Sequence, residues 1–249
     1  TGTVNFTPTD DSVYEGNEAA IIAISGVSGA DATENGTQTV TITITENESA
    51  PTITLARSAA SIDENSGSTI TLTATISGVT DSAVTVALST SGTATEGTDY
   101  GTISDITISA GATTGTATLD PTDDNVYEGD ETATIDISSV SGKSGVTENS
   151  TQQVSVTIAE NESAPTVTLA TSATSIAENA GSSLTLTATL SVATTADVTV
   201  ALSTSGTATE GTDYTDGSGN VDDIVISAGS TTGTVSFTPT DDSLYDATS

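Results

Sequence analysis

The chain has no cysteine, histidine, methionine or tryptophan, and only two basic residues among its 249. Without cysteine there is no disulfide, no thiol nucleophile and no thiolate metal site. Without histidine the chain lacks the usual general base, the Ser–His–Asp triad and the commonest zinc ligand. No apolar run reaches the roughly 18–20 residues that span a bilayer, and no signal peptide is visible. We therefore expect a non-catalytic segment that does not insert into a membrane.

Charge of one sign is nearly missing as well. The chain carries 34 acidic against 2 basic residues, a formal net charge of −32. This excess repels nucleic acid, so we expect no nucleic-acid partner. It favours bound cations, because carboxylates that pack together need their charge neutralised. We expect no role for Arg57 and Lys143 beyond local charge pairing.

The acidic residues do not form a disordered tail. They are scattered among valine, isoleucine, leucine and threonine, and hydrophobic residues make up 34% of the chain. Such a composition can build a core. A merely solubilising acidic surface remains the alternative to cation binding.

A long internal repeat organises the sequence. The segment STSGTATEGTDY at 89–100 returns unchanged at 203–214, which is 114 residues later. The segment TITENESAPT at 43–52 returns as TIAENESAPT at 157–166, again 114 residues later. This period exceeds the roughly 20–50 residues of a solenoid unit and matches the ~100 residues of one β-sandwich domain. The sequence therefore predicts tandem domains, each with its own core.

The phase of the repeat predicts three segments. Residues 1–48 form the C-terminal half of a first repeat, 49–163 a complete middle repeat, and 164–249 the N-terminal part of a third repeat. The missing initiator methionine leads us to expect an internal piece of a longer protein.

Strand patterns fill the middle repeat. Its segments rich in threonine, valine and isoleucine alternate apolar and polar residues with a period of two, between turns of glycine, aspartate, asparagine and serine. These segments are 68–77, 83–88, 103–108, 115–119, 132–137 and 153–158. No stretch has helical spacing. We predict an all-β protein of tandem immunoglobulin-like antiparallel β-sandwiches with about seven strands each.

Acidic residues recur at the ends of these strands. In the middle repeat they are Glu64, Asp99, Asp123, Asp124, Glu128, Glu131, Glu160 and Glu162. Their counterparts are Asp10, Asp11, Glu15, Glu18, Glu46 and Glu48 in the first repeat, and Glu178, Asp213, Asp241 and Asp242 in the third.

Several of these loops are expected to meet. Successive loops of a sandwich alternate between its two ends, so the turn at Asp99, the loop 123–131 and the terminus 160–162 can share one end. Calcium takes 6–8 oxygen ligands in irregular geometry, whereas magnesium demands a strict octahedron. We therefore favour calcium over magnesium, with solvated loop acids as the alternative.

The motifs also resemble a known family. GTATEGTDY at 92–100, DPTDDNVYEGDE at 120–131 and AENE at 159–162 together resemble Calx-beta domains, which occur in sodium–calcium exchangers and bacterial surface adhesins. The resemblance implies a seven-stranded sandwich with calcium at the end near the next domain. It also implies that the acidic residues named above are calcium ligands, together with the backbone carbonyl of Val126. The family's strong calcium binders end in a run of aspartates, where this chain has Glu160-Asn161-Glu162.

The expected role is structural or adhesive: an extracellular stalk or cell-surface filament that calcium stiffens at interdomain junctions. Its partners would be calcium ions, neighbouring repeats and other copies of itself, in head-to-tail or filament assembly. One alternative is a calcium-sensing regulatory module, and another is the non-catalytic repeat region of a larger secreted enzyme. Clustered carboxylates also occur in glycosidases, but one site in every repeat and no aromatic sugar platform argue against catalysis.

Overall fold

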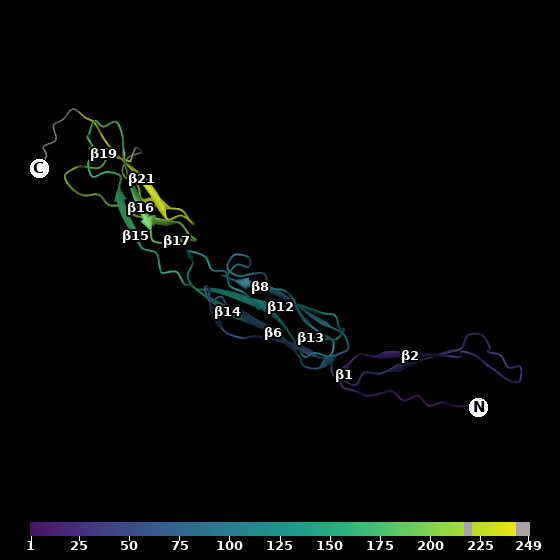
Figure 1. Ribbon diagram of the computed structural model, residues 1–249. Helices are drawn as coiled ribbons and strands as arrows, with labels where there is room; N and C mark the ends of the chain where they lie inside the picture. The colour runs from purple at the N-terminus through teal and green to yellow at the C-terminus, as the bar shows by residue number, and fades with distance from the viewer. Residues whose placement is uncertain (217–220, 243–249) are drawn as a thin grey trace. The chain divides into compact units, whose positions relative to one another are not determined.

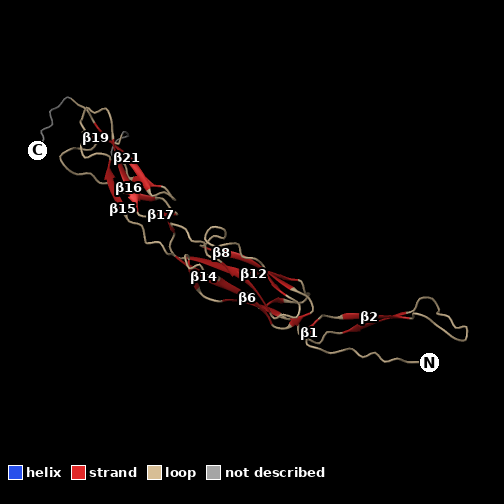
Figure 2. Ribbon diagram, viewed as in Figure 1, coloured by secondary structure: helices blue, strands red, loops and turns tan. Residues whose placement is uncertain are grey.

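The structure, a computed structural model, describes residues 1–216 and 221–242 and consists of strands and loops, with no helix in these ranges (Figure 2). The predicted all-β class is confirmed. None of the described segments is a helix long and apolar enough to cross a membrane. Contacts divide the chain into two compact units, residues 1–122 with 131–158 and residues 123–130 with 159–249. The unit boundaries differ from the predicted repeat boundaries, and the latter stay a prediction.

The middle repeat forms the two-sheet sandwich of the first unit (Figure 1). One sheet consists, in spatial order, of β10 (Thr114–Leu119), β6 (Ile70–Ile76), β4 (Thr52–Arg57) and β13 (Thr147–Glu148). The other consists of β5 (Ser61–Asp63), β14 (Gln153–Ala159), β12 (Glu131–Ser141), β8 (Val84–Gly92) and β9 (Ile106–Ile108). The long neighbours pair antiparallel, and β13 pairs with β4 in parallel.

Apolar side chains at every second strand position fill the space between these sheets. Along β6, Ile70, Leu72, Ala74 and Ile76 are buried, while the threonines between them lie nearer the surface. Strand residues point alternately to opposite faces, so this period of two places every apolar residue of β6 in the core. The facing sheet contributes further aliphatic side chains, and Tyr100 is the largest side chain that is fully buried.

The first repeat contributes a hairpin to the same unit. Its strands are β2 (Glu18–Ala23) and β3 (Thr39–Ile44). Ile22 pairs with Val40 in the register that Ile135 and Val154 adopt between β12 and β14. Ile22 is 46% exposed, however, while Ile135 is completely buried. The hairpin thus has the local pairing of the middle repeat without a facing sheet among the described residues.

The second unit repeats part of this plan. One sheet is β15 (Val167–Thr171), β16 (Leu184–Leu190), β21 (Thr232–Pro239) and β19 (Tyr214–Thr215). The other is β18 (Val198–Val200) with β20 (Ile224–Ile226). Leu169 is 55% exposed, whereas Leu55, its counterpart in the middle repeat, is 8% exposed. The third repeat therefore has an open apolar face within the described residues.

Two short parallel pairs link successive repeats. In the first unit, β1 (Val13–Tyr14) pairs with β7 (Val79–Thr80). In the second unit, β11 (Val126–Tyr127) pairs with β17 (Ala193–Thr194) in the equivalent register. The same two-residue pairing is therefore made twice, each time by the acidic loop of one repeat and a strand of the next.

Close approach of the two sheets requires glycine at one position of β10. A Cβ on Gly115 would lie 2.5 Å from the Thr107 carbonyl oxygen and 2.8 Å from Ile106 Cγ2. We expect Gly115→Ala to destabilise the first unit by about 1–3 kcal/mol, the usual cost of overpacking. In the control Gly101→Ala the added carbon meets nothing nearer than 3.9 Å. Urea unfolding checks this, and equal midpoints for the two variants would refute the packing argument.

Candidate metal centre

Six of the predicted ligands in the first repeat surround one cavity. The cavity, of about 40 Å³, is lined by residues of the loop 9–18 and of the segment 44–48. Its acidic members are Asp10, Asp11, Glu15, Glu18, Glu46 and Glu48. It is larger than the 10–15 Å³ that one water molecule occupies on this measure, so an ion fits. The six acids that the sequence groups in one predicted site therefore also lie around one cavity in the first unit.

Glu46 organises this loop through backbone hydrogen bonds. Its Oε2 accepts the N–H of Glu15 at 2.6 Å and that of Gly16 at 2.5 Å. Its Oε1 accepts the N–H groups of Asn47 and Glu48, both at 3.0 Å. The hydrogen bonds from the backbone and side chain of Glu48, with those from Gly16 and Glu15, lower the pKa of Glu46 to about 2. Glu46 is therefore a fixed anion in the middle of the acidic loop.

The neighbouring carboxylates oppose one another. The charge of Glu18, followed by burial and by other nearby acids, raises the pKa of Glu15. The side-chain hydrogen bond with Glu46 is the main cause that raises the pKa of Glu48. Carboxylates whose pKa is raised by a neighbouring carboxylate are stabilised by a cation placed between the two groups. The donor set contains only oxygen, which suits calcium.

The middle repeat builds the same loop around Glu160. Its Oε2 accepts the N–H of Glu128 at 2.6 Å and that of Gly129 at 2.8 Å, as Glu46 does with Glu15 and Gly16. Burial raises the pKa of Glu160, but the N–H donors of Glu128, Glu162 and Gly129 outweigh it and lower this pKa to about 2.

The aspartates of the two loops also correspond. Asp11 Oδ1 accepts the N–H of Val13 at 2.8 Å, and Asp124 Oδ1 accepts the N–H of Val126 at 2.7 Å. These bonds hold the turn that leads into β1 and into β11. The backbone of Val126, whose carbonyl is a predicted ligand, is therefore held by Asp124, another predicted ligand of the same loop.

Two predicted ligands lie buried in the first unit, where Glu64 and Asp99 are each 8% exposed. Asp99 Oδ2 accepts the N–H of Thr95 at 2.6 Å, which closes the turn 95–99. The first unit also contains Glu131, whereas Glu128, Glu160 and Glu162 belong to the second unit. The assignment of these residues as ligands stays a prediction.

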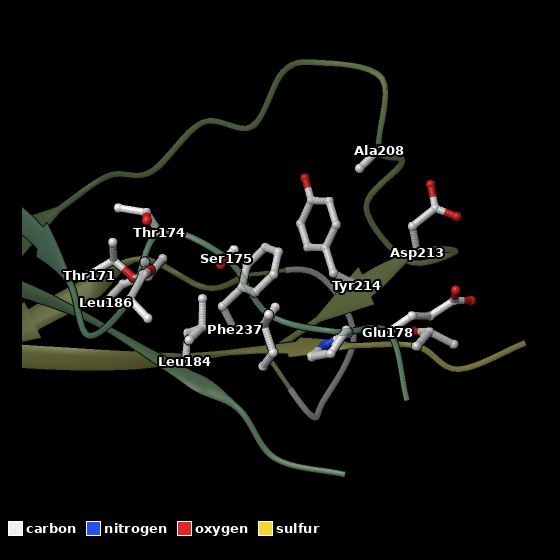
Figure 3. Close-up of a pocket in the computed structure, with 14 residues that line it drawn as sticks. Thr171, Thr174, Ser175, Glu178, Leu184, Leu186, Ala208, Asp213, Tyr214 and Phe237 are labelled. Atoms are coloured by element: carbon white, nitrogen blue, oxygen red, sulfur yellow. Dashed lines mark hydrogen bonds between the residues drawn. The ribbon is translucent and has the colours of Figure 1, made fainter. Parts of the chain in front are cut away.

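The third repeat has a similar turn. Asp213 Oδ2 accepts the N–H of Thr209 at 2.6 Å, and Glu178 Oε1 accepts the N–H of Asp242 at 3.1 Å. Figure 3 shows Glu178 and Asp213 at one end of a cavity of about 490 Å³. The stacked rings of Tyr214 and Phe237, with centroids 4.5 Å apart, line the same cavity. Asp241 and Asp242 are exposed.

Sequence reasoning missed four side chains that support the loops through hydrogen bonds, two as donors and two as acceptors. The Nδ2 of Asn47 donates to Asp10 Oδ1 at 2.9 Å, and that of Asn161 donates to Asp123 Oδ1 at 3.2 Å. The N–H of Glu46 is accepted by Asn17 Oδ1, and that of Glu160 by Asp130 Oδ1. The repeated ENES segment carried this signal, because its asparagine recurs between the two glutamates.

Comparison with known proteins gives one family. The profile of the Calx-beta domain matches residues 46–162 and again residues 160–249. None of the curated protein sequences matches the chain.

Several solved structures are similar. The apo form of the Calx CBD1 domain is 23% identical, with a TM-score of 0.37, over 44% of this chain and 98% of that domain. CBD12 from CALX1.2 is 20% identical, with a TM-score of 0.37, over 78% of this chain and 76% of that one. The calcium-binding domain CBD12 of CALX1.1 is 18% identical, with a TM-score of 0.35, over 73% and 72% of the two chains.

Calcium is expected to stabilise the folded chain through these loops. A ligand at ten times its dissociation constant adds about 1.4 kcal/mol per site, since it binds only the native state. Glu46→Gln and Glu160→Gln remove the charge and one of the two acceptor oxygens of each side chain. We expect each variant to reduce the calcium-dependent rise in melting temperature, and the double variant to lose most of it.

The matched control is Asp136→Asn, which removes one charge from the middle of β12. Asp136 accepts a hydrogen bond from Gln153 and belongs to neither loop. Thermal unfolding of the full chain with calcium and with chelator gives the measurement. An equal rise in all variants would mean that the loop acids are a solvated surface.

Proposed function

Because the chain belongs to the Calx-beta family, we propose that it is the calcium-stiffened repeat region of an extracellular stalk or cell-surface filament, with a structural or adhesive role. Calcium is the cofactor of its acidic loops. The proposal is non-catalytic, and the composition supports this, because the chain has no histidine or cysteine to serve as base or nucleophile.

One observation carries the proposal. The loop 10–18 contains predicted calcium ligands and also the strand β1, which pairs with β7 of the next repeat. The loop 123–131 likewise contains predicted ligands and the strand β11, which pairs with β17. An ion that orders such a loop also orders the strand that joins it to the following repeat. Calcium binding and the stiffness of the tandem array are therefore coupled by the chain itself.

The extracellular location is part of the proposal. Extracellular calcium-binding modules have dissociation constants of about 10⁻⁴–10⁻³ M, and we propose that range for these loops. Near-identical repeats support a spacer, because its length matters more than any single surface.

A calcium-sensing regulatory module is the second candidate. The same coupling between ligand loop and next repeat favours it, because an ion could then change the arrangement of neighbouring domains. A third candidate is the non-catalytic repeat region of a larger secreted enzyme, in which the calcium-bound repeats would serve as a spacer.

Calcium titration together with solution scattering separates the first two candidates. For the stalk we expect dissociation constants of about 10⁻⁴–10⁻³ M and a narrower spread of lengths when calcium is bound, without a change of mean shape. Submicromolar binding with a large change in the scattering curve would favour the sensor. Identical curves with calcium and with chelator would contradict stiffening.

Association with other copies is the remaining part of the proposal. In the middle repeat β8 pairs with β12, and a Cβ on Gly92 would lie 2.0 Å from the Thr132 carbonyl oxygen. At Gly206, its counterpart, nothing lies within 4 Å. The β2–β3 hairpin has the register of β12–β14. We therefore propose that this hairpin of one copy pairs beside β18 of another.

Analytical ultracentrifugation of the full chain tests this pairing. Ile22→Asp places a charge on the hairpin face that corresponds to the core, so we expect it to abolish association. The control Ile21→Asp places the same charge on the opposite face, because neighbouring strand residues point to opposite sides. A wild-type chain that stays monomeric, or two variants that behave alike, would refute the pairing.

A further inference from the structure

The one lysine of the chain is not a solvated surface residue. Lys143 lies in the loop between β12 and β13, and its side chain is only 12% exposed. Its Nζ lies 2.6 Å from Asp81 Oδ1 and donates a hydrogen bond to the backbone carbonyl of Glu15 at 2.5 Å. The Nζ also lies 5.9 Å from the centre of the Tyr14 ring. One ammonium group thus contacts the acidic loop of the first repeat and the body of the middle repeat.

The side chain of Tyr14 packs against Gly145, close to Lys143. A Cβ on Gly145 would lie 2.3 Å from the Tyr14 hydroxyl oxygen, so only glycine leaves room for the ring. The backbone of Gly145 has φ of +91°, a region that glycine adopts without strain. The backbone of Tyr14 is held as well, since it pairs with Thr80 between β1 and β7. Segment 13–15 is therefore fixed by strand pairing, by ring packing and by the ammonium group.

The hydrogen bonds of the Lys143 ammonium group are of the strong, charge-assisted kind. A hydrogen bond from a charged donor is shorter and roughly twice as strong as one between neutral groups. Here the donor serves a carboxylate and a carbonyl at once, in a position that water reaches little. The hydrogen bond from Lys143 is also the main cause that lowers the pKa of Asp81.

The second strand pair between repeats differs at the position of Asp81. Tyr127 pairs with Thr194 as Tyr14 pairs with Thr80. The position of Asp81, however, is occupied by Thr195 in the third repeat. In the first repeat, alanines at positions 30 and 32 stand where the middle repeat has Lys143 and Gly145. The ion pair with Asp81 therefore has no equivalent at Thr195, and the first repeat has no lysine at the position of Lys143.

We propose that Lys143 is a built-in cation that clamps the loop 13–16 onto the middle repeat without calcium. The junction at β1–β7 then stays ordered when calcium is removed, whereas the junction at β11–β17 depends on the ion. This inference goes beyond the proposed function, and it rests on that function only for the calcium dependence of the second junction.

The absence of cysteine makes the test clean, because introduced cysteines are the only labelling sites. Thr41→Cys with Thr116→Cys brackets the first junction, and Thr116→Cys with Thr185→Cys brackets the second; all three threonines are exposed. Spin labels on each pair report the spread of distances by pulsed electron resonance. In chelator we expect a narrow distribution for the first pair. Lys143→Gln should abolish that narrow peak and leave the second pair unchanged.

Control variants separate the clamp from a general loss of charge or of fold. Arg57→Gln removes the other cation, which donates to backbone carbonyls of Ala60 and Ser155 within the middle repeat, and should leave the first pair narrow. Asp81→Asn should broaden the first pair, and adding it to Lys143→Gln should broaden it little further. Gly145→Ala, which displaces the Tyr14 ring and leaves every charge in place, should broaden it too.

A first pair that stays narrow in Lys143→Gln would overturn the clamp. If calcium does not change the distance distribution of the second spin-label pair, the proposed stiffening is contradicted. The result for Lys143 would still stand. The two failures are therefore distinguishable in one set of samples.

Discussion

The repeats depend on one arrangement of a carboxylate and backbone N–H groups. Glu46 and Glu160 each accept two N–H groups from the acidic loop and two from the two residues that follow them. Four donors around one carboxylate keep it ionised and fix the curve of the loop. The same loops carry the other predicted ligands, so their charges lie near this fixed anion, and for this reason we expect a cation in these loops.

The long strands could be predicted because their side chains alternate over six residues or more. Segments 68–77, 115–119 and 153–158 correspond closely to β6, β10 and β14. The short strands could not be predicted, since β7, β11 and β13 have two residues each and two residues show no period. The tertiary structure brings these short strands together: β7 pairs only with β1 and β11 only with β17, and β13 lies at the edge of a sheet beside β4.

The candidate site divides in the same way. The acids were visible in the sequence because they recur at one spacing in each repeat. Their supporting backbone groups were not visible, because a backbone N–H has no signature in the sequence, and the recurring asparagine of ENES is easily taken for an ordinary turn residue. Lys143 was assigned only local charge pairing, and the ion pair with Asp81 is such a pairing. Its hydrogen bond to Glu15 could not be foreseen, because residues 128 positions apart in the chain meet there.

The two-residue pairing between repeats has a consequence for how such a chain changes over generations. Every contact it needs is carried within one repeat and the first strands of the next, so a whole repeat can be duplicated or deleted without creating a new kind of interface. Length would then change in steps of one repeat, and such a duplication would leave identical segments such as 89–100 and 203–214. The contact of Lys143 is less easily carried over to another repeat, because it needs Asp81 and the third repeat has Thr195 at that position.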